Sequence, residues 1–458
     1  MRHRAQGEDA EDRQVRYLSS TAVRDTLQHV LAGQGLRLHH ARLVDLQHRP
    51  GAGATGVFQA WAVPDDAPDD GAPEEDSPAE GDAAQAGREV FVALTAEAVP
   101  EDAVVDAGRA AETDWSAWIH PHDPLLAGLA LASDPASVAA VWGAGRVLTD
   151  LQTVSYRPLR RAVLRAEFAP AGEDAPPPAR SAGHGPGQDD VVRGGAPGQD
   201  PAGPRTVYLK VMRGGLAAGL HHRHVLLAAA GVPVPPVLGP PVADVLALGE
   251  GTGTVLAGAI MADGARHVDP REVTDLLDRM PGEILSLPRR EAWADRTPSY
   301  GHAAATALPD QARRIRSLVE HLQRQLATTD RGPVVPTHGD LYEANLLVRD
   351  GRISCVLDVD GAGPGHRVDD LACFLGHLAV LPAVDERYVF THRALRRFHS
   401  HFVGTVDPGA LACRSAAVAL SLVAGARDSG RPDWQAAARQ RLDIAESLLQ
   451  LPQSSSGW

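Results

Sequence analysis

The chain lacks the features that mark membrane, secreted and disulfide-stabilised proteins. It has no run of 18 apolar residues, so we expect no membrane-spanning helix. Its first residues, MRHRAQGEDAEDRQVRYL, contain no apolar segment typical of a secretory signal. The three cysteines, Cys355, Cys373 and Cys413, form no Cys-x-x-Cys pair, which argues against a zinc ribbon or a disulfide framework. These absences predict a cytoplasmic protein without a membrane partner.

The chain also lacks a broad basic face. Its net charge is −14, and residues 65–89 alone contribute −9, with ten carboxylates against one arginine. The acidity therefore belongs mainly to one segment. We expect no nucleic-acid partner, because proteins that bind nucleic acid concentrate positive charge on one surface. Hydrophobic residues make up 44% of the 458 residues, which is typical of a globular chain with two or three domains.

Two ordinary residue types are almost absent. Among the 44 lysines and arginines, 43 are arginine and one is lysine, Lys210, and asparagine occurs once, as Asn345. A GC-rich coding sequence accounts for the general loss of both types. Under that pressure, a surviving lysine or asparagine marks a position where a substitute fails chemically. Lys210 and Asn345 are therefore candidate functional residues.

Two low-complexity segments interrupt strand-like sequence. Residues 66–88 are rich in Pro, Asp, Glu and Ala, and residues 169–205 hold eight prolines and eight glycines. Both are flanked by runs with strand character, and we interpret both as enlarged hairpin connections. The flanking runs are Thr55–Val63, Val90–Val99, Ala162–Phe168 and Thr206–Met212.

The patterns along the chain predict an α/β (α+β) protein in three parts. Residues 1–140 are expected to form an N-terminal accessory α/β unit that opens with a helix near Ser20–Ala32. Residues 141–250 carry strands and one helix, Leu216–Ala230, which Gly231 and Pro233 end. Residues 251–451 are mostly helical, and residues 452–458 are expected to be a disordered tail. The helices expected after position 365 are Asp370–Leu381, Thr391–Phe402, Leu411–Ala426 and Trp434–Leu451.

A hairpin near the middle of the helical part carries two candidate metal ligands. Asp350-Gly351 predicts a two-residue turn between strands at 345–348 and 353–359. This register pairs Asn345 with Val356. Asp358 lies two residues further along the same strand, so its side chain is on the same face as that of Val356. Asn345 and Asp358 then become diagonal neighbours about 7–8 Å apart. A divalent cation fits between them.

A short loop, His338-Gly339-Asp340, precedes the hairpin. Asp340 stands five residues before Asn345, and Asp358 follows after the hairpin. This is the arrangement of kinase catalytic loops, in which the first Asp accepts the proton of the substrate hydroxyl while the Asn and the second Asp hold Mg²⁺. We predict that Asp340 and His338 are catalytic and that Asn345 and Asp358 are metal ligands.

The motifs HGDLYEAN, VLDVD and GPGHRVDDLA resemble those of the aminoglycoside phosphotransferase/choline kinase family, which is related to the protein kinases. The resemblance is close over these forty residues, extends loosely from about 150 to 450, and leaves 1–140 outside. It implies a two-lobed kinase-like fold with a β-rich N-lobe and a mostly helical C-lobe. It also implies transfer of the γ-phosphoryl group of ATP, with Mg²⁺, to a hydroxyl of a small molecule. Asp370 would brace the catalytic loop, serve as a helix N-cap, or do both.

The resemblance further implies a nucleotide site. Lys210 lies in TVYLKVM, where the family places the lysine that contacts the α- and β-phosphates. The turn YRPLRR and the stretch VLALGEG are placed like the loop that covers the phosphates and the hinge that holds adenine. The residues expected to bind the nucleotide are Lys210, Arg160, Arg161, Leu248 and Glu250.

One alternative remains beside this interpretation, and a second is rejected. The helix Leu216–Ala230 contains no glutamate to pair with Lys210, so the chain could be a catalytically weak, nucleotide-binding pseudokinase with an interaction module. The stretch VLDVDG resembles haloacid-dehalogenase-type phosphatases, but these need a downstream lysine, and Lys210 lies upstream. Residues 371–458 carry nine arginines and seven carboxylates, which favours a sugar or another neutral or anionic acceptor over an aminoglycoside.

Overall fold

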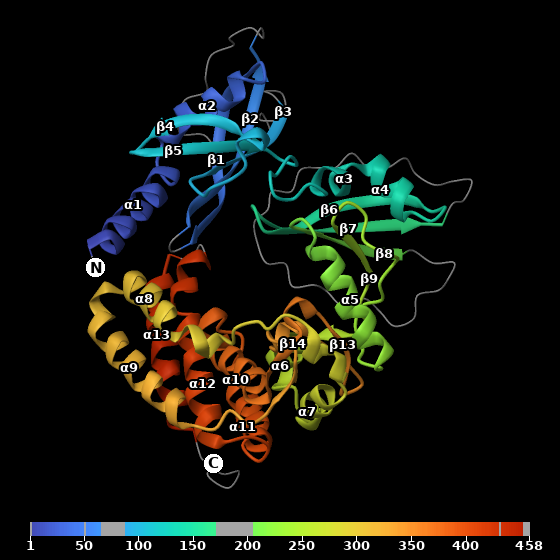
Figure 1. Cartoon of the computed structure of the whole chain (residues 1–458), viewed down its shortest axis with the longest axis vertical. Helices are drawn as coiled ribbons and strands as arrows, with labels where there is room; N and C mark the ends of the chain where they lie inside the picture. The colour runs from blue at the N-terminus through green and yellow to red at the C-terminus, as the bar shows by residue number, and fades with distance from the viewer. Residues whose placement is uncertain (1, 50–51, 66–87, 171–204, 430–431, 452–458) are drawn as a thin grey trace. The chain divides into compact units, whose positions relative to one another are not determined.

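The computed structural model describes residues 2–49, 52–65, 88–170, 205–429 and 432–451 (Figure 1). They divide into two compact units. One comprises the described residues up to position 170 together with 205–219 and 238–248, and the other comprises 220–237 and the described residues from 249 onward. Nearly all of the two predicted inserts, and the whole predicted tail, lie outside the described residues, and the predicted domain bounds stay a prediction.

The first unit opens with two helices and a five-stranded antiparallel sheet. The helix expected near Ser20–Ala32 is α2, whereas the polar sequence before it did not predict α1. Side chains alternate across the sheet, so Val92 and Leu94 join the core with α1 and α2, while Ala93 faces the opposite side. The elements are α1 (Arg2–Leu18), α2 (Val23–Ala32), β1 (Leu36–Arg49), β2 (Gly53–Pro64), β3 (Arg88–Thr95), β4 (Val105–Ala110) and β5 (Thr113–Ile119), in sheet order β1-β2-β3-β5-β4.

A second antiparallel sheet completes this unit, in the order β6-β7-β8-β9. One apolar core joins its strands to the outer face of the first sheet through Val57, Ala93 and Trp118. The accessory residues and the β-rich lobe are thus packed together. Both enlarged hairpins are confirmed, because β2 pairs with β3 and β7 with β8. The elements are α3 (Leu129–Ser133), α4 (Pro135–Trp142), β6 (Val147–Arg157), β7 (Arg161–Ala169), β8 (Arg205–Met212) and β9 (Val245–Gly249), with α5 (Leu216–Ala229) between β8 and β9.

The second unit is mainly helical. One of its cores lies among α8, α9, α10, α12 and α13, which run side by side in Figure 1. Small residues such as Ala416 and Ala417 belong to this core and allow the helices to pack closely. The elements are β10 (Thr254–Val255), α6 (Leu256–Asp263), α7 (Arg271–Asp278), α8 (Thr297–Ala307), α9 (Ala312–Thr328), β11 (Val334–Thr337), β12 (Leu346–Arg349), β13 (Arg352–Val356), β14 (Gly363–His366), α10 (Arg367–Val384), α11 (Thr391–Phe402), α12 (Pro408–Ser421) and α13 (Trp434–Leu448).

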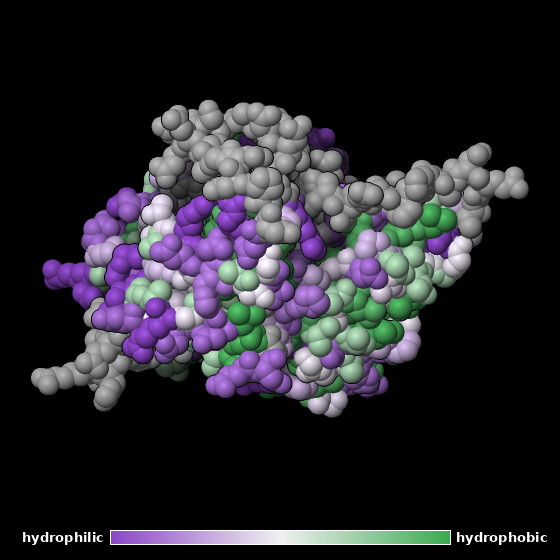
Figure 2. All heavy atoms as spheres, turned by 90° about the horizontal axis from the view of Figure 1, so that it is seen from above, coloured by the Kyte–Doolittle hydropathy of each residue, from purple (hydrophilic) through white to green (hydrophobic). Residues whose placement is uncertain are grey.

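The predicted fold class is confirmed, since a β-rich lobe is followed by a mostly helical one. All four expected C-terminal helices form, with ends shifted by at most a few residues. The stretch Pro408–Arg427 is long and apolar enough to cross a membrane by length and composition, but 72% of its most apolar window is buried inside the protein. This burial is typical of a core helix. Figure 2 shows one face of the molecule, on which hydrophilic and hydrophobic side chains are mixed.

Candidate active site

The loop His338-Gly339-Asp340 follows β11 directly and turns sharply at its glycine. Gly339 has a φ of +80°, which L-residues with a side chain rarely adopt. A Cβ atom there would also lie 2.6 Å from the carbonyl oxygen of Gly361. Glycine is therefore required at this position, and it allows the loop to lie against the segment that follows the hairpin.

Asp370, in the first turn of α10, anchors this loop. Its carboxylate accepts the backbone N–H groups of His338 and Gly339, both at 2.8 Å. The side chain is 1% exposed, and burial raises its pKa to about 6. The expected bracing contact is present. The expectation of a helix N-cap is wrong, because His366 is the N-cap of α10 and Asp370 lies inside the helix.

The backbone of Asp340 is held from both sides. The Nδ1 atom of His338 accepts the Asp340 N–H at 3.3 Å, and the His338 Nε2–H donates to the carbonyl of Leu357 at 2.9 Å. The side-chain Nδ2 of Asn345 donates to the Asp340 carbonyl at 3.0 Å. His338 thus contacts backbone groups with both ring nitrogens, which orients the loop against the residue before Asp358.

The Asp340 carboxylate itself contacts side chains from elsewhere in the unit. Trp293 Nε1 donates to its Oδ1 at 3.1 Å, and Arg290 Nη2 lies 3.5 Å from its Oδ2. The Cys373 thiol donates to Oδ1 at 3.9 Å. The side chain of Asp340 keeps 14% of its surface exposed, so a reactant can still reach it. No motif or spacing in the sequence marks Trp293, Arg290 or Cys373 as neighbours of Asp340.

An aromatic cluster surrounds these contacts. Trp293 stacks with Tyr300 at 5.7 Å and meets the edge of His377 at 6.1 Å, and Tyr342 stacks on His377 at 4.3 Å between ring centroids. The guanidinium of Arg296 lies over the Tyr300 ring at 5.1 Å. Burial lowers the pKa of His377 to about 4, so its imidazole is neutral at pH 7. Asp340 therefore lies among aromatic faces and arginines.

The hairpin forms, but its register differs from the prediction. The turn at Asp350-Gly351 has two residues with positive φ, as expected. A bulge between Leu347 and Val348 then shifts the pairing by one position toward the start of β12. Asn345 ends a short 3₁₀ turn before β12, instead of facing Val356 in a strand. The predicted diagonal geometry of Asn345 and Asp358 is wrong.

A different contact brings the two predicted metal ligands together. The carbonyl of Asn345 accepts the N–H of Leu357 at 2.8 Å, which places the residue next to Asp358 against Asn345. Asp358 lies beyond the end of β13 in the left-handed conformation, with φ 55° and ψ 47°. Non-glycine residues adopt this conformation at a cost and cluster at functional sites when they do. The role of both residues as metal ligands stays a prediction.

Glu343 is a buried carboxyl inside the same motif. Its side chain is 3% exposed, and its Oε2 has no hydrogen-bond partner among the described residues. Burial raises its pKa to about 7. An unpartnered buried carboxylate is costly, so the folded protein favours the protonated form.

The predicted nucleotide-binding residues lie in earlier parts of the sequence than the loop His338-Gly339-Asp340. Lys210 lies in β8 opposite Val163 of β7 and is 8% exposed. Leu248 is buried in β9, and Glu250 follows the strand. The division between the two compact units falls between Leu248 and Gly249, inside the segment interpreted as a hinge. Helix α5 contains no acidic residue, as the sequence indicated.

The basic turn between β6 and β7 is anchored by accessory residues that the sequence analysis missed. Asp123 accepts the N–H of Leu159 and the hydroxyl of Tyr156, both at 2.8 Å. Arg160 Nη2 lies 3.3 Å from a carboxylate oxygen of Glu97, whose side chain is 9% exposed. The guanidinium of Arg160 is therefore shared with a protein carboxylate, whereas Arg161 begins β7. Both arginines stay predicted phosphate contacts.

Comparison with known proteins finds a family model that matches part of the chain. Residues 200–398 match the model of the phosphotransferase enzyme family. The match includes the loop His338-Gly339-Asp340, the hairpin and Lys210, and it confirms the resemblance seen in the sequence. No curated protein sequence matches the chain.

Several solved structures are similar to the chain at low sequence identity. A thermostable mutant of the aminoglycoside phosphotransferase APH(4)-Ia, in a ternary complex with ADP and hygromycin B, is 14% identical and has a TM-score of 0.45; the match covers 69% of this chain and 98% of that one. Spectinomycin phosphotransferase APH(9)-Ia, with ADP and spectinomycin, is 13% identical over 69% and 97%, with a TM-score of 0.43. A choline/ethanolamine kinase family protein from Mesorhizobium loti is 18% identical over 54% and 84%, with a TM-score of 0.40.

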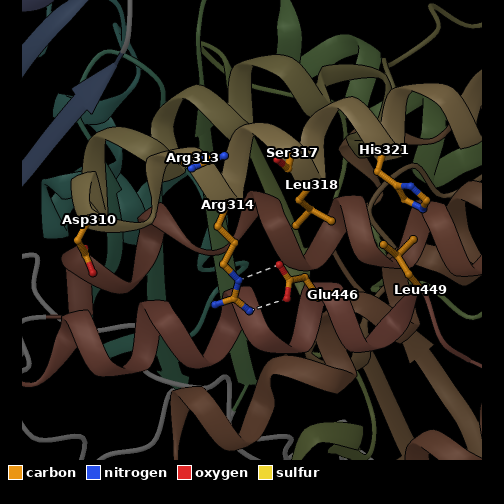
Figure 3. Close-up of a pocket in the computed structure, with 8 residues that line it drawn as sticks. All are labelled: Asp310, Arg313, Arg314, Ser317, Leu318, His321, Glu446 and Leu449. Carbon is orange, nitrogen blue, oxygen red and sulfur yellow. Dashed lines mark hydrogen bonds and ion pairs between the residues drawn. The ribbon is translucent and has the colours of Figure 1, made fainter.

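A hollow of about 540 Å³ lies between α9 and α13 (Figure 3). Arg314 crosses it and binds Glu446 through its Nε at 2.8 Å and Asp443 through Nη2 at 2.7 Å. None of the predicted site residues lines this hollow. A small hollow of about 20 Å³ lies beside the catalytic loop instead, lined by Gly339, Trp293 and Asp370 among others.

Proposed function

We propose that the protein transfers the γ-phosphoryl group of ATP to a hydroxyl group of a small molecule. One observation carries the proposal: the Asp340 carboxylate is partly exposed on a loop that backbone contacts hold at both ends, within a phosphotransferase family match. The ADP complexes of two similar phosphotransferases favour ATP as the donor. The reaction then needs a base, charge neutralisation and correct positioning.

Asp340 is the proposed base. It orients the acceptor hydroxyl and takes its proton as the oxygen attacks the γ-phosphorus. A new O–P bond forms, the bond from that phosphorus to the bridging oxygen breaks, and ADP leaves. His338 acts as a positioning residue, because both of its ring nitrogens contact backbone groups that hold the loop.

Asn345 and Asp358 are the proposed Mg²⁺ ligands. An amide oxygen and a carboxylate are the hard donors that Mg²⁺ prefers. The Nδ2 of Asn345 donates to the Asp340 carbonyl, so its oxygen is the atom left for a cation. Mg²⁺ bound there would neutralise phosphate charge. Lys210, with Arg161, would contact the phosphates, and Leu248 and Glu250 would contact the base of the nucleotide.

We further propose a neutral or anionic acceptor, such as a sugar. The Nη2 atom of Arg290 lies 3.5 Å from Oδ2 of Asp340, the proposed general base. The guanidinium of Arg296 lies over the ring of Tyr300 in the adjacent aromatic cluster. A polycationic aminoglycoside would meet like charge there, whereas anionic groups would be attracted. The ring of Trp293, which contacts Asp340, offers an apolar face beside the reacting hydroxyl.

The test is a screen of acceptors with Mg·ATP and Mg·GTP, covering sugars, amino alcohols, homoserine-like compounds and aminoglycosides. We expect ADP release that depends on an acceptor and falls about 10²–10⁴-fold in Asp340→Asn, the usual effect of losing a general base. Asp310→Asn, in the α9–α13 hollow that no predicted site residue lines, is the matched control and should retain activity. Efficient phosphorylation of an aminoglycoside alone would refute the acceptor class. ATP binding without turnover across the panel would favour the pseudokinase alternative.

A further inference from the structure

We infer that Asp340, Cys373 and His377 form a binding site for a transition-metal cation of the Zn²⁺ class, and that a metal bound there inhibits phosphoryl transfer. One ligand atom from each side chain can be chosen so that the three atoms lie within 4.8 Å of one another. The site differs from the proposed Mg²⁺ ligands, Asn345 and Asp358. Metal binding stands by itself, while inhibition rests on the proposed role of Asp340 as the base.

The donor atoms select the class of metal. A thiol sulfur, an imidazole nitrogen and a carboxylate oxygen together are typical ligands of Zn²⁺, which binds all three types at 2.0–2.3 Å. Mg²⁺ and Ca²⁺ prefer oxygen alone and would gain little from Cys373 or His377. Three protein ligands leave a fourth position for water in a tetrahedral site.

The positions of the ligands suit such a site. Cys373 and His377 are four residues apart in α10, so their side chains project from one face of the helix, one turn apart. The sulfur of Cys373 lies 3.9 Å from Oδ1 of Asp340. Tetrahedral bonds of about 2.0 and 2.3 Å put oxygen and sulfur about 3.5 Å apart. This pair of donors therefore needs to approach by only about 0.4 Å.

The imidazole of His377 carries an independent indication. Its Nε2 is buried and has no hydrogen-bond partner among the described residues. Such an atom is rare in folded proteins and calls for a specific explanation, of which an absent ion is one. The ring is already oriented by Tyr342, which stacks on one side at 4.3 Å, and by the neighbouring ring of Trp293.

The surrounding contacts match those of metal sites elsewhere. Ligating carboxylates are usually hydrogen-bonded by outer residues, and Trp293 Nε1 supplies this bond to Asp340 at 3.1 Å. Burial raises the pKa of the Cys373 thiol, so the metal-free protein holds it protonated. A bound Zn²⁺ deprotonates a coordinating thiol by its own charge, and its binding therefore releases a proton to the buffer.

Inhibition follows from the shared carboxylate. An Asp340 oxygen that donates its lone pair to Zn²⁺ is a weaker base and cannot orient the acceptor hydroxyl. The cation would also lie beside Arg290, 3.5 Å from the other oxygen, and displace it through like charge. Zinc should therefore lower turnover even when Mg²⁺ is in large excess.

The test uses the full chain, freed of metal, titrated with Co²⁺ and Zn²⁺. Co²⁺ bound to a thiolate gives a sulfur-to-metal charge-transfer band that surface histidines and carboxylates do not produce. We expect this band in the wild type and in the matched control Cys413→Ser, whose thiol is equally buried in α12. It should be absent in Cys373→Ser. Loss of a direct ligand should also raise the Kd for Zn²⁺ by at least about 100-fold, since outer-shell changes alone cost 10–100-fold.

A second variant, His377→Gln, tests the site even if Cys373→Ser does not fold. It should retain the thiol and lose most of the Zn²⁺ affinity, while far-ultraviolet circular dichroism reports the fold of every variant. Zinc that binds wild type, Cys373→Ser and His377→Gln equally well, or a wild type without the charge-transfer band, would overturn the site. If metal binds as expected but turnover in Mg·ATP is unchanged by Zn²⁺, the inhibition is wrong. If no acceptor is phosphorylated, the proposed function fails while the metal measurements still decide the site.

Discussion

Replacing Glu343 with glutamine should stabilise the protein at neutral and alkaline pH. The side chain is 3% exposed, and one carboxylate oxygen lacks a hydrogen-bond partner among the described residues. Burial raises its pKa from 4.5 to about 7. The folded protein therefore binds this proton more tightly than the unfolded chain does, and ionisation works against folding.

The size of the effect follows from the two pKa values. Below pH 4.5 both states hold the proton, so the group contributes no penalty. As pH rises toward 7 the unfolded chain loses its proton first, and the free energy of unfolding falls. At 1.36 kcal/mol per pKa unit the full loss is about 3 kcal/mol, most of it between pH 5 and 8. Glutamine keeps the shape of the side chain and cannot ionise.

Urea unfolding at pH 5 and pH 8, followed by circular dichroism, measures this difference. The stability of Glu343→Gln relative to wild type should increase by about 2–3 kcal/mol between the two pH values. Glu320→Gln, an exposed substitution in α9, is the control and should follow the wild type at both. Parallel profiles for wild type and Glu343→Gln would refute the argument from burial.

Three further predictions concern the catalytic loop and the nucleotide. Asp370→Ala should leave two buried loop N–H groups unpaired, lower the free energy of unfolding by about 2–6 kcal/mol and reduce turnover; an unchanged urea midpoint would contradict this. Asn345→Ala and Asp358→Ala should each raise the Mg²⁺ concentration for half-maximal activity, Asp358→Ala more because it removes a full charge; Mg²⁺ titrations that overlay the wild type would refute the ligand assignment. Lys210→Arg should fold normally but lose about 100-fold in turnover, because a forked guanidinium displaces phosphates that a compact ammonium fits. Full activity of this variant would show that arginine serves there.

Local sequence determined most of the C-terminal helices, the two long hairpins and the motif of the loop at Asp340. Amphipathic periodicity is a property of neighbouring residues, and it predicted the C-terminal helices, with Thr391–Phe402 matching α11 at both ends. Strand patterns on either side of the two inserts predicted the β2–β3 and β7–β8 pairs. The catalytic loop could be predicted because Asp340 and Asn345 belong to one continuous motif.

Only the tertiary structure decided how the loop is surrounded. The β12–β13 register shifts by one residue between Leu347 and Val348, and Asn345 lies in a 3₁₀ turn before β12. The two-residue turn at Asp350-Gly351 predicts neither feature. Trp293 reaches Asp340 from 47 residues away. Asp123 likewise holds the backbone of Leu159 from 36 residues away. Spacing along a chain predicts side chains that share one helix or strand, whereas contacts between distant segments depend on how whole elements bury their apolar faces against each other.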